Sequence, residues 1–157
     1  MHPVKNQSSC GSCWAFAAAT AMEGMVAVRD AAGAIRLSEQ EAVDCVTNAY
    51  GCNGGWMEYA WDYWIANGAM TNADYPYRAY DQSCMHDSNS SNLTYATAHG
   101  QITTSITDVV LQLQNGPMTV AVAAGNNCWR YYGGGILSTS DGCPTGLDHA
   151  VTLVAYT

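Results

Sequence analysis

The chain has 157 residues and is 48% apolar, which suits one domain or one two-lobed unit with a real core. Five basic residues against thirteen acidic ones give a formal net charge of −8, so nucleic acid and anionic membranes are poor partners. No apolar run reaches the length of a membrane span, and no signal peptide is visible, so we expect any targeting segment to lie outside this sequence.

Three helices are predicted in the first half of the chain. Residues 13–29 are apolar nearly all round, which favours a helix buried in the centre of the fold. In "LSEQEAVDC" Ser38 is the expected N-cap, and Glu41 three residues later would complete a capping box. The turn-rich "GCNGG" separates this helix from a third one, which ends at Gly68 and is expected to present on one face Met57, Ala60, Trp61, Trp64 and Ile65.

The character of the chain changes after about Tyr75. Residues 81–97 are polar and typical of a loop, and "DVVLQLQNGP" indicates a short helix. The segments "MTVAVAA", "GGIL" and "HAVTLVAY" indicate strands between glycine-rich turns. We therefore expect an α+β fold, with a helical lobe over about 1–95, an antiparallel β-rich lobe over about 96–157, and a site in the cleft between them. The last strand has no partner after it, so we expect this lobe to lack its final strands.

Seven cysteines, an odd number, predict three disulfides and one free thiol. Cys10 and Cys13 have the spacing of a redox pair, but such pairs place the first cysteine at a helix start, and here the helix starts at the second. A zinc site would need a second matched pair, and Cys45 and Cys52 are too far apart, so no metal or cofactor is expected. In the remaining hypothesis Cys10 forms a disulfide with another cysteine, and Cys13 stays free as a thiolate nucleophile at the helix N-terminus. A structural disulfide or an inert buried thiol remains an alternative for Cys13.

A cysteine nucleophile needs a base held on a rigid element. His149 is the best candidate of the four histidines because it opens an apolar strand, directly after Asp148. His2 lies at a ragged chain end, His86 is expected to be a solvated surface residue, and His99 has no rigid element around it. A purely structural role for His149 remains open at this point.

Six segments in order resemble the papain-like cysteine peptidases of the cathepsin L and papain type: "VKNQSSCGSCWAFAA", "LSEQEAVDC", "GCNGG", "YPY", "CWRYYGGGIL" and "LDHAV". The resemblance implies a two-lobed papain-like fold and a cysteine-type endopeptidase that acts through a thioester acyl-enzyme. It implies Cys13 as nucleophile, His149 as its imidazole partner and Gln7 as the oxyanion-hole glutamine.

The resemblance also places the substrate. The substrate backbone would pair with Gly54 and Gly55, and Asp148 corresponds to the acidic residue beside the family's histidine. The implied pocket residues are apolar, which predicts a hydrophobic residue at the second position before the scissile bond: Trp56, Met57, Ala121, Leu147 and Ala150. No insertion resembles the occluding loop of cathepsin B, which favours an endopeptidase over an exopeptidase.

The implied disulfides are Cys10–Cys52 and Cys45–Cys84, and we add Cys128–Cys143 as a hypothesis because these two residues flank a predicted hairpin, "WRYYGGGIL". The expected partners are polypeptide substrates and, as for relatives, a propeptide or cystatin-like inhibitors. We expect a monomer in a lysosome, a vacuole or the secreted fraction, because disulfides need an oxidising compartment.

The sequence departs from the family pattern in three respects. Ser8 stands where a glycine is usual, and the family's Asn-Ser-Trp motif after the histidine is missing, together with a propeptide. The alternative is therefore a catalytically impaired protease-like fragment, or a binding or inhibitory module.

Overall fold

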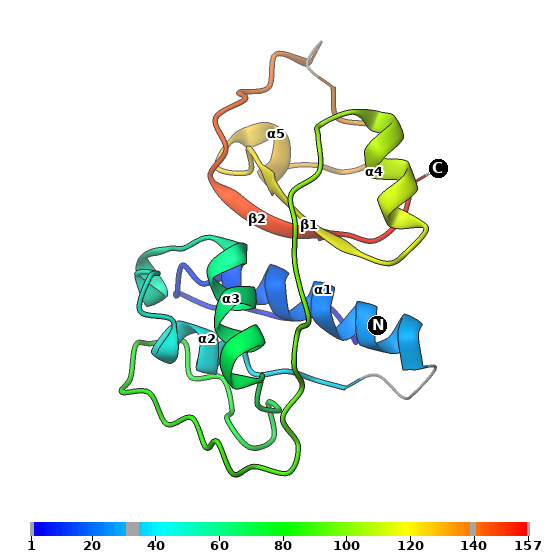
Figure 1. Ribbon diagram of the computed structural model, residues 1–157. Helices are drawn as coiled ribbons and strands as arrows, with labels where there is room; N and C mark the ends of the chain where they lie inside the picture. The colour runs from blue at the N-terminus through cyan, green and yellow to red at the C-terminus, as the bar shows by residue number, and fades with distance from the viewer. Residues whose placement is uncertain (1, 31–34, 139–140, 157) are drawn as a thin grey trace.

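The computed structural model describes residues 2–30, 35–138 and 141–156. Helices α1, α2 and α3 form one part, while strands β1 and β2 with helices α4 and α5 form the other, and an extended segment joins the two (Figure 1). The elements in chain order are α1 (Cys13–Asp30), α2 (Glu39–Cys45), the 3-10 turn η1 (Gly51–Asn53), α3 (Met57–Asn67), α4 (Ile106–Leu113), β1 (Met118–Val122), α5 (Asn127–Arg130) and β2 (His149–Leu153). None of the described helices is both long and apolar enough to cross a membrane.

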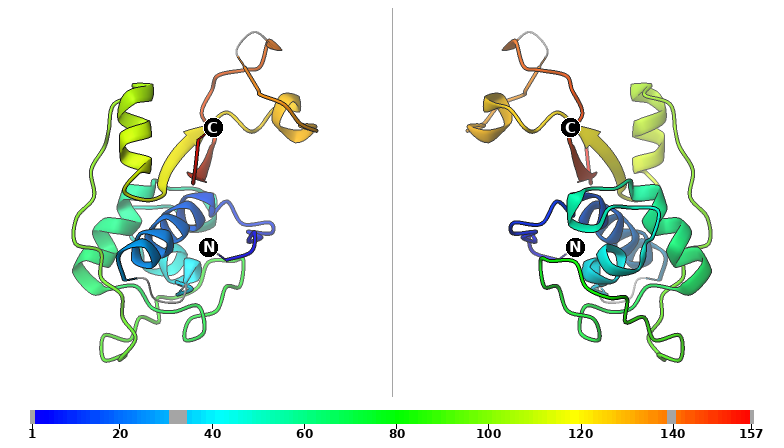
Figure 2. Two further views of the ribbon diagram at one scale, coloured as in Figure 1. Left: turned by 90° about the vertical axis from the view of Figure 1, so that its right-hand side faces the viewer. Right: turned by 90° about the vertical axis from the view of Figure 1, so that its left-hand side faces the viewer.

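Helix α1 lies at the centre, as its apolar surface predicts, with α2 and α3 on one side and the strands on the other (Figures 1 and 2). Its buried side chains are mostly alanines, whose small size lets the neighbouring elements approach closely. Trp14 of α1 and Trp64 of α3 are fully buried, and the Trp14 indole donates to the Gly51 carbonyl at 3.1 Å. This core fixes the end of α1 at which Cys13 lies.

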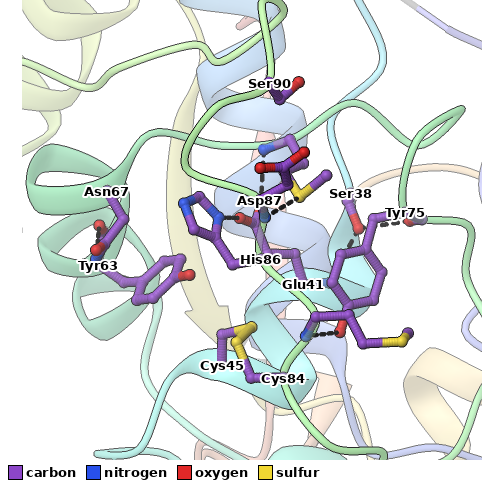
Figure 3. Close-up of polar contacts among 12 residues, drawn as sticks. Ser38, Glu41, Cys45, Tyr63, Asn67, Tyr75, Cys84, His86, Asp87 and Ser90 are labelled. Atoms are coloured by element: carbon purple, nitrogen blue, oxygen red, sulfur yellow. Dashed lines mark hydrogen bonds and ion pairs between the residues drawn. A yellow bond between two sulfur atoms is a disulfide. The ribbon is translucent and has the colours of Figure 1, made fainter.

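The start of α2 follows the sequence prediction only in part. The Ser38 hydroxyl accepts from Glu41 N at 2.9 Å, so the N-cap is confirmed. The reciprocal half of the capping box is wrong, because Ser38 N donates instead to the Met70 carbonyl. The buried Glu41 carboxylate turns away to accept from Met70 N at 2.8 Å and to contact His86 Nδ1 at 2.6 Å (Figure 3).

Helix α3 ends at Gly68, as predicted. Gly68 takes a φ of 79° and donates its N–H to the Trp64 carbonyl, a conformation that favours glycine. The predicted buried face is too wide: Met57, Ala60 and Trp64 are buried, whereas Trp61 is half-buried and Ile65 is exposed. The face of α3 that packs on α1 is thus the narrower row at i, i+3 and i+7.

The two strands form one antiparallel sheet with Met118 opposite Leu153 and Val122 opposite His149. The sheet lies across α1 (Figure 2), where the Thr152 hydroxyl donates to the Ala17 carbonyl at 3.2 Å. This contact is what brings a strand of the second part beside the helix that carries Cys13.

The prediction of a strand at "GGIL" and of a hairpin at "WRYYGGGIL" is wrong. Asn126 caps α5 by accepting from Trp129 N, so the residues before the glycines form a helical turn instead. Gly134 and Gly135, which follow, lie at positive φ, and Ile136 is 92% exposed with no partner strand beside it. A strand needs such a partner to satisfy its backbone groups, and local sequence cannot supply one.

Three disulfides occur among the described residues: Cys10–Cys52, Cys45–Cys84 and Cys128–Cys143. The first two cross-link the helical part, and the third joins α5 to the segment that precedes β2. Cys13 remains a free thiol.

Candidate active site

Cys13 is the first residue of α1 and is partly exposed. The helix begins here because the Ser12 carbonyl accepts from Ala15 N at 2.9 Å and from Phe16 N at 3.1 Å. The N–H groups of Cys13 and Trp14 come before any residue that could donate to Ser12 in this way, and the helix dipole adds partial positive charge at this end. Such an end favours a thiolate or a developing oxyanion beside it.

The loop before α1 is fixed by covalent and hydrogen bonds. The disulfide Cys10–Cys52 ties it to η1, and Gly11 N donates to the Cys52 carbonyl at 2.7 Å. A side chain at Gly11 has no room, since its Cβ would lie 2.5 Å from that carbonyl oxygen. The Gln7 side-chain Nε2 donates to the Cys10 carbonyl at 2.8 Å, which directs the amide toward the helix start.

The segment that carries Gln7 is anchored in the helical part by a buried cation. Lys5 Nζ lies 2.7 Å from Glu23 Oε1 on α1 and 2.6 Å from Glu39 Oε1 on α2. All three side chains are almost fully buried, so the charges must remain paired for the segment to stay in place. The N-terminal segment is therefore part of the framework of the site.

His149 opens β2 from the other part of the molecule. The residue before it, Asp148, donates its N–H to the Val122 carbonyl, so the sheet register continues through the histidine. The Asp148 carboxylate accepts from Ala124 N at 2.7 Å and from Gly125 N at 2.9 Å. Asp148 therefore holds the turn that follows β1, a role that sequence reasoning did not indicate.

One cavity of about 470 Å³ brings the three central candidates together. It runs along α1 between the N-terminal segment and β2, and the residues that line it include Gln7, Cys13, Phe16, Ala17, His149 and Ala150. Gln7 and Cys13 come from one end of the chain and His149 from the other, so only the packing of β2 on α1 joins them.

The other expected substrate-binding residues lie outside this cavity. Gly55 packs against the Trp14 ring and Gly54 has a φ of 116°, both in the loop after η1. Trp56 and Leu147 are exposed, whereas Met57 is buried in the core. Ala121 lies opposite Ala150 in the sheet, so these two small apolar residues are neighbours.

The remaining histidines correct three expectations. His86 is not a solvated surface residue, because its side chain is 12% exposed and paired with buried Glu41 (Figure 3). His2 Nε2 lies 2.7 Å from the Ile35 carbonyl, and His99 Nε2 lies 2.8 Å from Asp62 on α3, so neither is loose. Each contact joins residues more than thirty positions apart, which no local pattern reveals. No cluster of three or more potential metal ligands occurs in the part of the chain that the structure describes.

Two further residues of the site were missed by sequence reasoning, Ser12 and Tyr77. The Tyr77 hydroxyl donates to the Gln7 carbonyl at 2.8 Å and lies 2.7 Å from Ser12 Oγ. The triplet "YPY" was noted only as a motif, and its distance of 70 positions from Gln7 gives no signal of this contact.

The fold and this arrangement define a papain-like α+β protein, and comparison with known proteins agrees. The model for the family described as papain family cysteine protease matches residues 1–157, and the chain belongs to this family. The chain is 37% identical to macrodontain-1 of Ananas macrodontes over 99% of its length and 72% of that protein. It is 41% identical to digestive cysteine proteinase 3 of Homarus americanus over 98% of its length and 49% of that protein.

A solved structure gives the same result. The cysteine protease of Carica candamarcensis in complex with E-64 superposes with a TM-score of 0.91 at 31% identity, covering 98% of this chain and 71% of that one. The chain thus spans between about half and about seven tenths of the length of these relatives.

Proposed function

We propose that this chain forms the nucleophile-bearing framework of a cysteine endopeptidase, with Cys13, His149 and Gln7 as its catalytic residues. The observation that carries the proposal is that one cavity is lined by a free cysteine at a helix N-terminus, a histidine and a side-chain amide. These groups supply a nucleophile, a general acid–base and an oxyanion donor, which are the three functions that acyl transfer requires.

The chemistry then runs in two steps. The Cys13 thiolate attacks the peptide carbonyl, and the oxyanion receives hydrogen bonds from the Cys13 backbone N–H and from Gln7 Nε2. Protonated His149 gives its proton to the leaving amine, which leaves a thioester on Cys13. His149 next takes a proton from water, whose oxygen attacks the thioester; the acid leaves, and the Cys13 thiolate and protonated His149 are restored.

The proposed specificity is for a hydrophobic residue at the second position before the scissile bond. Ala150 lines the same cavity as Cys13, and Ala121 is its neighbour across the sheet, so the surface there is small and apolar. Trp56 and Leu147 would add apolar surface where they are exposed. A series of peptides that differ only at this position tests the proposal; preference for Arg or Glu there would contradict it.

The proposed setting is an oxidising one, lysosomal, vacuolar or secreted, which the three disulfides favour. A propeptide and cystatin-like inhibitors are the proposed protein partners of a monomer. A related ragweed pollen protease has been solved in its proform, with a TM-score of 0.89 and 29% identity to this chain.

The experiment is covalent labelling with an epoxide inhibitor of the E-64 type at mildly acidic pH, followed by peptide mapping. We expect one adduct, on Cys13, and its loss in His149→Ala. The matched control is His99→Ala, because His99 lies outside the cavity and should leave labelling unchanged. Gln7→Ala should retain labelling and lower turnover of a peptide substrate by about 100-fold.

The same samples separate the alternatives. Labelling without turnover would favour a catalytically impaired fragment, and absence of labelling in a folded chain would favour a binding or inhibitory module. Titration of thiols in the unfolded, non-reduced protein should give one reactive cysteine; two or more would contradict the proposed disulfide pairing.

A further inference from the structure

Tyr77 joins three groups at the start of α1. Its hydroxyl donates to the Gln7 carbonyl at 2.8 Å and contacts Ser12 Oγ at 2.7 Å, and its ring packs edge-on against Phe16 with 4.8 Å between centroids. Ser12 is fully buried and directly precedes Cys13, and Phe16 lines the cavity. A single side chain therefore contacts both the loop that bears Gln7 and the helix that bears Cys13.

The direction of these hydrogen bonds is fixed by the number of available protons. The Gln7 carbonyl can only accept, so the one phenolic hydrogen of Tyr77 goes to it. Ser12 Oγ must then donate to the Tyr77 oxygen, since its other neighbour, the Cys10 carbonyl, is farther away at 3.5 Å. Ser12 thus donates to Tyr77, and Tyr77 donates to Gln7. Two hydrogen bonds that share a hydroxyl in this way strengthen each other in a buried setting.

Tyr77 also makes the shorter of the two hydrogen bonds that restrain the Gln7 main chain. The other, from Cys10 N, is 3.4 Å long. The Gln7 side chain uses one Nε2 hydrogen for the Cys10 carbonyl, which leaves its second hydrogen for a substrate oxyanion. Burial raises the pKa of the Tyr77 phenol, so the hydroxyl remains a donor from acidic to neutral pH.

We propose that Tyr77 is a positioning residue for oxyanion stabilisation, in that its hydroxyl holds Gln7 at the distance from Cys13 at which the Gln7 amide reaches the oxyanion. The inference rests on the proposed function and adds to it a residue that acts through Gln7 and touches no substrate. Oxyanion donors act only when they are held in place before the charge forms, so a loose Gln7 lowers the rate of the chemical step more than it lowers binding.

The test compares Tyr77→Phe with Tyr75→Phe, which removes the other hydroxyl of the same "YPY" triplet. Tyr75 is buried, and its hydroxyl donates to Asp44 at 2.8 Å and accepts from Met85 N, all remote from the cavity. For Tyr77→Phe we expect a fall in kcat of about 10-fold with KM changed less than about 2-fold, because the ring contact with Phe16 remains. For Tyr75→Phe we expect a lower melting temperature and an unchanged kcat.

Two further measurements separate positioning from stability. The rate of alkylation of Cys13 by iodoacetamide needs no oxyanion donor and should be equal in both variants and the unsubstituted chain. In a Gln7→Ala background, Tyr77→Phe should cause no further loss of kcat, since the group it positions is gone.

The outcomes are distinct. An active chain in which Tyr77→Phe retains full kcat, or in which its effect persists undiminished without the Gln7 amide, overturns this inference and leaves the proposed function standing. A folded chain that neither hydrolyses peptides nor reacts with the epoxide at Cys13 overturns the proposed function first, and the inference with it.

Discussion

The two parts of the molecule differ in how their side chains are packed. Every buried apolar side chain among the described residues lies between Cys10 and Tyr75. In the second part Ile106 is 82% exposed and Tyr131 81% exposed, and the sheet has only two strands. Cys13 and Gln7 thus belong to a part with its own core, whereas His149 is held in place by the pairing of β2 with β1 and by the packing of β2 on α1. The nucleophile therefore lies in a part that has its own buried core, and the base does not.

The largest effect that tests this comparison comes from the disulfides. Replacing both Cys45 and Cys84 by alanine should lower the free energy of unfolding by about 4 kcal/mol, because this bridge closes a sequence separation of 39 within the helical part, where Cys45 is buried with Met70 and Tyr75. The same replacement of Cys128 and Cys143 should lower it by at most about 3 kcal/mol, because this bridge closes a sequence separation of only 15 and joins segments with no buried apolar side chains. Urea denaturation of the two double variants measures both values, and equal losses would mean that the second part contributes to the common core after all.

The next test pushes the two parts away from each other with a single added methyl group. Gly24 of α1 lies so close to Pro117 that a Cβ would overlap the Pro117 Cγ. Gly24→Ala should therefore push β1 and β2 away from α1, destabilise the protein by about 1–3 kcal/mol, and slow epoxide labelling of Cys13 through the loss of His149. The readouts are thermal unfolding and the rate of labelling.

A second substitution checks that this effect is steric. Adding Pro117→Ala to Gly24→Ala removes the overlapping ring atoms and leaves a Cβ–Cβ distance of 3.6 Å, an ordinary contact. The double variant should recover most of the labelling rate. If it does not, the loss comes from α1 itself rather than from separation of the two parts.

The difference between the helical part and the strand-containing part also explains which features the sequence could predict and which it could not. The bounds of α1 and the caps at Ser38 and Gly68 follow from local patterns, because a helix satisfies its own backbone and its ends have characteristic residues. The strand expected at "GGIL" fails because strands depend on partners that are distant in the sequence. The family resemblance rests on six segments of the sequence. It allowed His149 to be paired with Cys13, although the two residues are 136 positions apart.

The buried polar contacts were not predictable. Glu41 and His86 are 45 positions apart, and each alone has the character of a surface residue. Tyr77 gives no local sign that its hydroxyl reaches Gln7. Such contacts form only where several elements meet, and they are concentrated in the helical part that supports Cys13.

The pH dependence of stability distinguishes the buried pair Glu41–His86 from the exposed pair Asp62–His99. Burial raises the pKa of the Glu41 carboxyl above its ordinary 4.5, although Met70 N and His86 oppose this rise. The folded chain thus binds a proton at Glu41 more tightly than the unfolded chain, so this group stabilises fully below pH 4.5 and its contribution declines as pH rises through the folded pKa. Tyr63 and Tyr75, whose pKa values are raised by the same burial, stay neutral in this range.

The variant for this measurement is Glu41→Gln, which still offers an acceptor to Met70 N and a donor to His86 Nδ1. The melting temperature of the unsubstituted chain should decline as pH rises above about 4.5, and in Glu41→Gln this decline should be absent. Asp62→Asn is the matched control, because it removes the carboxylate of the exposed pair Asp62–His99 and should leave the pH profile as it is. A profile that is unchanged in Glu41→Gln would assign the decline to other groups.

The smallest expected effect concerns Ser8, which takes a φ of 55° in the loop next to Gln7. This left-handed conformation disfavours any residue with a Cβ, so Ser8→Gly should raise stability by up to about 1 kcal/mol. Ala79, with a φ of 63°, is the matched position away from the cavity, and Ala79→Gly should behave alike in thermal unfolding. Because Tyr77 and Cys10 hold Gln7 on either side of this turn, Ser8→Gly should leave kcat unchanged. A fall in kcat without a fall in stability would mean that the strained turn itself sets the position of Gln7, and that the well-packed part supports the site by holding this strain as well as by burying its core.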